Sequence, residues 1–171
     1  SEPYKNLTFS LLLRLEHIPA NRQFLLSEIV SLATVDVLNR YATGFSIKWP
    51  NDIYWHDKKI AGILIENVLS GSTFSRAIIG MGLNINQKNF YSDAPNPVSL
   101  YQITGRTYKI EKILDEFTEA FGKRYTDTFT NSSDRIHKEY IAALYRNDGV
   151  YPFYSDGNIF HASIADVELD G

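Results

Sequence analysis

Three apolar runs separated by short polar turns occupy residues 52–85 and constrain the fold more than any other feature. The sequence reads DIYW, then the turn HDKK, then IAGILIEN, and after SGS it continues as TFSRAIIGMGLNI. Runs of this length bounded by turn residues predict consecutive strands joined by hairpins. Such hairpins build a mostly antiparallel sheet, and the buried face of that sheet needs helices to cover it.

Helical periodicity appears on both sides of these hairpins. Apolar residues recur at helical spacing over Gln23–Tyr41, and Asn21 is a candidate N-cap for this helix. Further helices are predicted from about Ile110 to Tyr125 and from about Ser133 to Tyr145. The fold class that follows is α+β, a mostly antiparallel sheet with helices packed on one side.

Two more strands and a loop complete this part of the chain. Residues 6–15 are rich in Leu, Phe and Thr, which predicts a strand covered on both faces. Residues 45–49 predict a short strand that ends at Pro50, because proline cannot continue a central ladder. Residues 87–107 are predicted to be loop.

The composition changes near Asn147–Gly149. The segment that follows contains short apolar runs on both sides of Asp156–Gly157, a pair typical of a hairpin turn. We therefore predict two units, residues 1–147 and a small all-β unit at residues 148–171. A length of 171 residues suits one domain with such an appendage.

Charge and residue usage argue against several classes of function. The net charge is −3 and there is no basic stripe, so no nucleic-acid partner is expected. The chain has no cysteine, and its four histidines lack ligand spacing, so no metal site is predicted. The apolar stretches are too short to span a bilayer and no signal peptide is evident, so we expect a cytoplasmic location.

Glycines in the two central strands suggest a site. Alternation gives one face of the first strand Ile60, Gly62, Leu64 and Glu66, and one face of the second Gly80, Gly82 and Asn84. Glycine weakens a strand, so three of them in neighbouring strands need a reason. One reason is a flat ligand lying against bare backbone. A close helix contact or a bulge explains them equally well.

Polar residues around the first hairpin suggest the same site. Lys59 is expected roughly opposite Asp52 across the hairpin, with Lys48 and Asn51 nearby. A lysine ammonium is a compact charge that suits a carboxylate or phosphoryl oxygen. Hairpin lysines more often extend into solvent, and the aspartate alone can form an Asx-turn after Pro50.

These motifs together resemble the catalytic domain of biotin protein ligases. The resemblance rests on KWPNDIYW, on KKIAGILIE at the expected distance, and on IIGMGLNIN. It extends from NLTFSLLL through APNPVSLYQITG to HKEYIAALYR, and the tail resembles the opening strands of the SH3-like domain that these ligases carry. It implies a fold of the class II aminoacyl-tRNA synthetase and biotin ligase type, with residues 148–171 as the start of the SH3-like domain.

The resemblance also implies an activity. In that family, ATP and biotin form biotinyl-5′-adenylate, and biotin is then transferred to a lysine of a biotin carboxyl carrier domain. Lys59 matches the catalytic lysine, which contacts the biotin carboxylate and the α-phosphate. The other implied contacts are Gly62, Leu64, Gly80 and Gly82 for biotin, and Lys48, Asn51, Asp52 and Asn84 for ATP or the adenylate. Mg²⁺ is expected on the triphosphate, and a homodimer is possible.

The sequence departs from the family pattern at its beginning. The Gly/Arg-rich loop expected just before Ser1 is absent, as are the groups that hold the ureido ring of biotin, and Tyr4 stands where relatives commonly have glycine. We therefore expect the chain to be a fragment of a longer protein. Two alternatives stay open: a lipoate ligase or octanoyltransferase of the same fold, and a catalytically inactive binding module.

Overall fold

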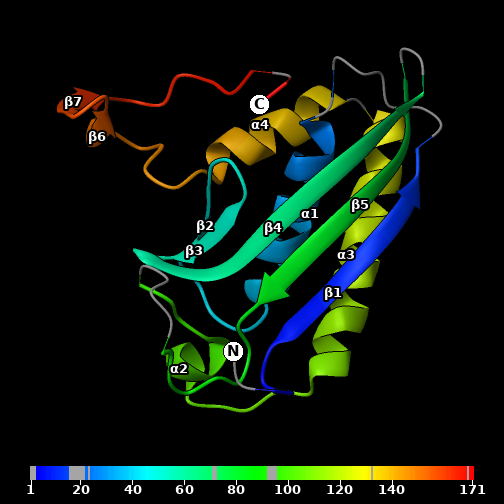
Figure 1. Ribbon diagram of the computed structural model, residues 1–171, viewed down its shortest axis with the longest axis vertical. Coiled ribbons are helices and arrows are strands. Elements are labelled where there is room, and N and C mark those ends of the chain that lie inside the picture. The colour runs from blue at the N-terminus through cyan, green and yellow to red at the C-terminus, as the bar shows by residue number, and fades with distance from the viewer. Residues whose placement is uncertain are drawn as a thin grey trace.

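The main sheet of the protein has five strands. The computed structural model describes residues 3–15, 22, 24–70, 73–91, 96–131, 133–168 and 170–171. The strands are β1 (Leu7–Arg14), β2 (Phe45–Lys48), β3 (Asp52–Trp55), β4 (Lys58–Ser70) and β5 (Thr73–Leu83). They lie in the order β1-β5-β4-β3-β2, and every neighbouring pair is antiparallel (Figure 1). The predicted hairpins and the α+β class are therefore confirmed.

Three helices, α1 (Leu25–Leu38), α3 (Ile110–Asn131) and α4 (Ser133–Ala142), pack behind this sheet (Figure 1). Almost every side chain of α1 is buried, because α1 contacts the sheet as well as α3 and α4. A helix in that position needs apolar residues on all sides. All three predicted helices are confirmed, although α3 continues six residues beyond the expected end at Tyr125. The candidate N-cap Asn21 lies outside the described residues.

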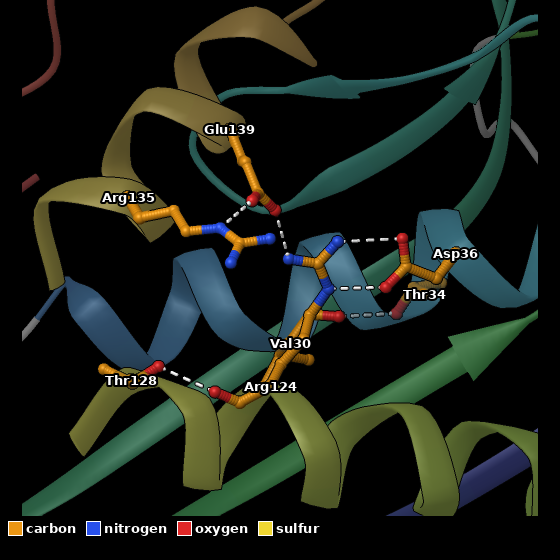
Figure 2. A network of polar contacts seen from close by, with 7 residues as sticks. All are labelled: Val30, Thr34, Asp36, Arg124, Thr128, Arg135 and Glu139. Carbon is orange, nitrogen blue, oxygen red and sulfur yellow. Dashed lines mark hydrogen bonds and ion pairs between the residues drawn. The ribbon is translucent and has the colours of Figure 1, made fainter. Parts of the chain in front are cut away.

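A network of ion pairs holds the three helices together (Figure 2). The guanidinium of Arg124 on α3 donates to both carboxylate oxygens of Asp36 on α1, at 2.5 and 2.8 Å. It also donates to Glu139 on α4 at 2.8 Å, and Glu139 accepts a further bond from Arg135. Burial opposes the charge on Arg124, but these hydrogen bonds raise its pKa above the ordinary value.

The predicted loop at residues 87–107 contains a short helix, α2 (Leu100–Thr104), so this prediction was wrong in part. Ser99 caps the helix: its hydroxyl accepts from the backbone of Gln102, and the Gln102 side chain accepts from the backbone of Ser99. This is a capping box, and its Ser-x-x-Gln signature is present in the sequence. Gly105 ends the helix in the left-handed conformation.

One face of the sheet is left open by the described residues. Burial alternates along β1, and Leu12 on its outward face is 63% exposed. The expectation that β1 is covered on both faces is therefore wrong for the described structure. The physical reason is that the three packing helices all lie on the other face of the sheet (Figure 1).

A second, two-stranded sheet lies apart from the main one. Its strands are β6 (Tyr151–Ser155) and β7 (Asn158–Ala162), and Asp156 and Gly157 form the turn with positive φ angles, as the sequence predicts. After β7 the chain returns toward the helices, where Ile164 packs against the hydrophobic core as a partly buried side chain. None of the described helices combines the length and the apolar character that crossing a membrane requires.

Candidate active site

A single row of residues crosses all five strands on the open face. The strand register pairs Lys48 with Asp52, Asp52 with Gly62, Gly62 with Gly82, and Gly82 with Thr8. Paired residues in adjacent strands point to the same face of a sheet. The row therefore has charged side chains at one end, a hydroxyl at the other, and bare backbone between them.

Two adjoining hollows lie on this face. One has a volume of about 370 Å³ and the other about 290 Å³, and they share Thr8, Lys59, Gly62 and Gly82. The first extends over Gly80 and Leu64, and its lining includes Ser10, Asn51 and Asp52. The second extends toward Phe90 and is lined by the amide side chains of Asn6, Asn84 and Gln87. Lys59 therefore stands where the two hollows meet.

The glycines border open space. A Cβ atom added to Gly82 would meet nothing within 4 Å among the described residues, and one added to Gly80 would meet only Leu64, at 3.8 Å. The register shifts of β4 lie elsewhere, at its pairing with Ile53 and Tyr54 and near Val68. Neither a helix contact nor a bulge therefore accounts for Gly80 and Gly82. The geometry supports the alternative of a slot for a flat ligand.

Lys59 and Asp52 form an ion pair at the edge of this slot. The Nζ of Lys59 lies 2.6 Å from Oδ1 of Asp52, and the two side chains are 35% and 22% exposed. A Cβ atom on Gly62 would lie 3.4 Å from Cε of Lys59, so the ammonium and the glycine backbone are neighbours. The expectation that Lys59 faces Asp52 is right for the side chains, although the strand partner of Lys59 is Tyr54.

A bulge explains this offset. The pairing of β3 with β4 shifts by one residue, because Asp52 and Ile53 pair with Gly62 and Ala61 whereas Tyr54 pairs with Lys59. Ile60 is the extra residue, and it is fully buried. The prediction that Ile60 shares a face with Gly62 is therefore wrong. The extra residue breaks the period of two, so Lys59 takes the place on the open face that alternation assigns to Ile60.

The segment after residue 95 fixes the backbone of Lys59. The backbone N–H of Lys59 donates to the carbonyl of Asn96 at 2.9 Å, and the carbonyl of Lys59 accepts from the N–H of Val98 at 2.8 Å. Asn84 supports the same segment, because its side-chain amide donates to the carbonyl of Val98 at 3.1 Å. Asn84 thus lines the second hollow and also holds Lys59 in position.

Most of the predicted site residues line the two hollows, but one does not. Seven of the predicted contacts besides Lys59 line the two hollows: Asn51, Asp52, Gly62, Leu64, Gly80, Gly82 and Asn84. Lys48 lines neither hollow. Its ammonium donates to the hydroxyl of Tyr54 at 3.1 Å and lies 4.8 Å from the centre of that ring. The register brings Lys48 to the end of the row, but its contacts turn it toward Tyr54.

Several lining residues were missed from the sequence. Thr8 and Ser10 come from the outward face of β1, and strand alternation identifies them once β1 is known to pair with β5. Asn6 and Gln87 are joined by a hydrogen bond of 2.5 Å across 81 residues, which no local pattern indicates. Phe90 supplies the aromatic side chain of the second hollow.

Tyr4 precedes the site in an unusual conformation. Its φ angle is 59°, in the left-handed region that favours glycine, and its side chain is 95% exposed. The resemblance expected glycine at this position. The backbone therefore has the conformation suited to glycine, although the residue is tyrosine.

Comparison with known proteins identifies the class first by its fold. A biotin protein ligase from Aquifex aeolicus, solved in complex with biotin and ATP, superposes with a TM-score of 0.76 at 22% identity. The superposition covers 96% of this chain and 68% of that one. At this level of identity the likeness shows the fold alone, an α+β sheet with helices packed on it.

Sequence comparisons then identify the family. Residues 1–84 match the Biotin/lipoate A/B protein ligase family. The bifunctional ligase/repressor BirA of Bacillus spizizenii is 32% identical over 138 residues, which cover 77% of this chain and 41% of that protein. The biotin–[acetyl-CoA-carboxylase] ligase of Paracoccus denitrificans is 30% identical over 128 residues, with coverages of 71% and 53%. Together these findings indicate the catalytic domain of a biotin protein ligase, of which the chain spans about half the relatives' length or less.

Proposed function

We propose that this chain forms part of an ATP-dependent biotin ligase that makes biotinyl-5′-adenylate and transfers biotin to a lysine of a carrier domain. The observation that carries the proposal is the slot over Gly62 and Gly82 with the ammonium of Lys59 at its edge. The name of the Paracoccus relative as a biotin ligase, and the complex of the Aquifex protein with biotin and ATP, support the same assignment.

The two hollows suit the two substrates. The flat ring system of biotin would lie on the bare backbone of Gly62 and Gly82, with its carboxylate toward Lys59. ATP would enter the second hollow, where the ring of Phe90 and the amides of Asn84 and Gln87 offer apolar and polar contacts. In this arrangement the α-phosphate meets the biotin carboxylate beside Lys59.

The first step needs electrostatic stabilisation. A carboxylate oxygen of biotin attacks the α-phosphorus, a new P–O bond forms, and pyrophosphate leaves. Negative charge accumulates on the phosphoryl oxygens in the transition state, and a fixed cation beside them lowers the barrier. The ion pair with Asp52, the backbone bonds of residue 59 and the neighbouring glycine hold this cation in place before substrate binds.

The second step transfers the activated acyl group. The neutral amine of the carrier lysine attacks the acyl carbon, the C–N bond forms, and AMP leaves with the electrons of the broken C–O bond. The open face beside the first hollow gives such a lysine a route to the acyl carbon. Lys59 again faces the phosphate on which charge is released.

Mg²⁺ belongs to this proposal as the counter-ion of the triphosphate. Magnesium at such sites is usually held by the substrate phosphates together with one or two carboxylates. Asp52 is the carboxylate that lines the first hollow, and among the described residues no cluster of three possible ligands is found. When bound, the ion would neutralise charge on the departing pyrophosphate.

The partners follow from the same proposal. The acceptor would be a biotin carboxyl carrier protein or domain of a biotin-dependent carboxylase, and the enzyme would act in the cytoplasm. A homodimer, and the assignment of residues 148–171 to an SH3-like domain, remain predictions.

One assay separates this function from its alternatives. The protein is incubated with ATP, biotin and a carrier domain, and the product is probed with streptavidin. Biotinylation of the carrier that requires ATP is the expected result. Incorporation of lipoate in place of biotin would identify a lipoate ligase instead. Binding of the carrier without transfer of either acid would identify an inactive binding module.

A further inference from the structure

His137 on α4 lies between two carboxylates. Its Nδ1 is 2.6 Å from Oε1 of Glu28 on α1, and its Nε2 is 2.7 Å from Oδ1 of Asp166 in the segment that follows β7. Glu28 is buried, whereas the side chain of Asp166 is 69% exposed. The imidazole therefore connects the core of the helical layer to a segment on its surface.

Both contacts require a proton. A carboxylate oxygen only accepts a hydrogen bond, so each ring nitrogen that faces one must present an N–H. A neutral imidazole has one N–H and one lone pair, and the lone pair would face a carboxylate without a proton between them. Both contacts are satisfied while the three groups hold two protons in all. Loss of one proton leaves one contact repulsive.

Apolar contacts also hold this segment. Ile164 and Val167 pack as partly buried side chains against the core, and the backbone N–H of Val167 donates to the same Asp166 oxygen at 2.9 Å. The segment runs from the β6–β7 hairpin back toward α4 (Figure 1). Asp166 is therefore a polar anchor between this surface segment and the helices.

Other charged and titratable groups surround the histidine. Arg22, before α1, attracts Glu28 and lies 3.8 Å from Asp134 of α4. Tyr140 of α4 is buried. Burial and, to a smaller extent, the negative charge of Glu28 raise the pKa of Tyr140. Burial also raises the pKa of Glu28, and the hydrogen bond with His137 offsets part of that rise.

We propose that His137 is a proton-dependent latch that fastens the segment 163–168, and with it the β6–β7 hairpin, to α1 and α4. The latch is closed while both ring nitrogens are protonated and opens when one proton is lost. It lies on the helical side of the sheet and does not depend on the proposed ligase activity.

The direction of the pH dependence follows from the partners. Partial burial lowers the pKa of His137, but the hydrogen bonds to Glu28 and Asp166 outweigh this effect, so the pKa lies above its ordinary value of 6.5. A raised histidine pKa contributes stability that is complete below the pKa of the unfolded chain. That contribution is lost as the pH rises through the pKa of the folded protein, so the latch opens on the alkaline side.

Two measurements on the same sample test the latch. The ring nitrogen shifts of His137 in isotope-labelled protein are followed by NMR between pH 5 and pH 10. Hydrogen exchange of the Val167 amide is followed over the same range and corrected for its intrinsic pH dependence. We expect His137 to titrate above 6.5 and the protection of Val167 to fall at the same midpoint.

Variants separate the latch from ordinary packing. Asp166→Asn keeps the exposed side chain's shape but removes its charge, so it should lower the midpoint of His137 and reduce Val167 protection already at pH 6. His161→Gln, on β7, removes a different histidine and should change neither readout. A His137 midpoint at or below 6.5, or Val167 protection that does not follow that midpoint, would overturn the proposal.

Discussion

Two charged clusters of this protein differ in how completely the fold uses their charge. The guanidinium of Arg124 is 16% exposed and is bound by carboxylates from α1 and α4 (Figure 2). Among the described residues, the ammonium of Lys59 has one carboxylate partner, Asp52, and it lies beside two hollows. The first cation joins three helices. The second keeps donor capacity for a ligand, because an ammonium has three donors. Arg124 also lines a hollow of about 370 Å³, so open space alone does not indicate a site. The difference is that carboxylates of two other helices bind Arg124, whereas Lys59 lies beside bare glycine backbone.

Removing the ammonium of Lys59 should have the largest effect. Lys59→Ala removes the cation beside the proposed phosphoryl transfer, so adenylate formation should fall roughly 100- to 1,000-fold. The free energy of unfolding should change by less than about 1 kcal/mol, because exposed ion pairs contribute little. Biotin-dependent exchange of pyrophosphate into ATP measures the first quantity, and urea unfolding measures the second. Lys58→Ala, at the exposed neighbour, is the control. If Lys59→Ala exchanged pyrophosphate into ATP at the rate of the unmodified protein, Lys59 would have no role in the mechanism.

Removing the guanidinium of Arg124 should give the opposite pattern. Arg124→Leu leaves Asp36 and Glu139 close together without their shared partner, which should lower the free energy of unfolding by about 2–3 kcal/mol. The hydrogen bond from Arg124 holds the pKa of Glu139 below its ordinary value, so that pKa should rise in the variant. Turnover per folded molecule should be unchanged well below the melting temperature. Arg135→Ala, which removes a more exposed partner of Glu139, should cost less than about 0.5 kcal/mol. Equal losses in the two variants would contradict the structural role of Arg124.

Filling the slot tests whether the open space matters. Gly82→Val places a branched side chain where no described atom lies within 4 Å, so the folded protein should tolerate it. Biotin would collide with that side chain, and its KM should rise about tenfold or more, equivalent to about 1.4 kcal/mol of lost binding. Gly122→Val, at a helical glycine whose added Cβ also meets nothing within 4 Å, is the matched control for stability. An unchanged KM for biotin in Gly82→Val would place the ring elsewhere.

The smallest expected change lies outside both clusters. Tyr4→Gly removes a side chain from a backbone with φ of 59°, which should relieve roughly 1–2 kcal/mol of strain. Glycine also adds roughly 0.5–1 kcal/mol of entropy to the unfolded chain, so a net stabilisation of about 0.5 kcal/mol is expected. Urea unfolding measures it, with Tyr91→Gly as the control at an exposed tyrosine without a positive φ. Destabilisation by Tyr4→Gly as large as in the control would show that strain at residue 4 is negligible.

Local patterns predicted most of the fold. The hairpins of β3, β4 and β5 follow from apolar runs and turn residues, and the three large helices follow from their periodicity. The open face of β1 did not follow, because which face a helix covers is decided by the whole assembly. The helix α2 could have been found, since Ser99 and Gln102 form a capping box that is legible in the sequence.

The sequence predicted some residues of the candidate site and missed others. Glycine spacing predicted which face of the sheet carries the hollows, because alternation survives along β5 and most of β4. Lys48 was assigned to the site from the hairpin residues and the family resemblance, whereas in the structure its ammonium lies over the ring of Tyr54 and lines neither hollow. The partners of His137 are 109 and 29 residues away along the chain, so no short motif points to them. Contacts of that range depend on how α1, α4 and the end of the chain meet.

The extra residue at position 60 has a consequence for how variants of this protein are interpreted. Because Ile60 is buried while Lys59 lies on the open face, a packing defect at Ile60 would shift the ammonium of Lys59. A conservative substitution such as Ile60→Val would then lower the activity in an assay markedly, although it would lower the melting temperature only slightly. Deleting Ile60 would remove the bulge, leave Lys59 on the open face in regular alternation with Gly62, and take a large apolar side chain out of the interior.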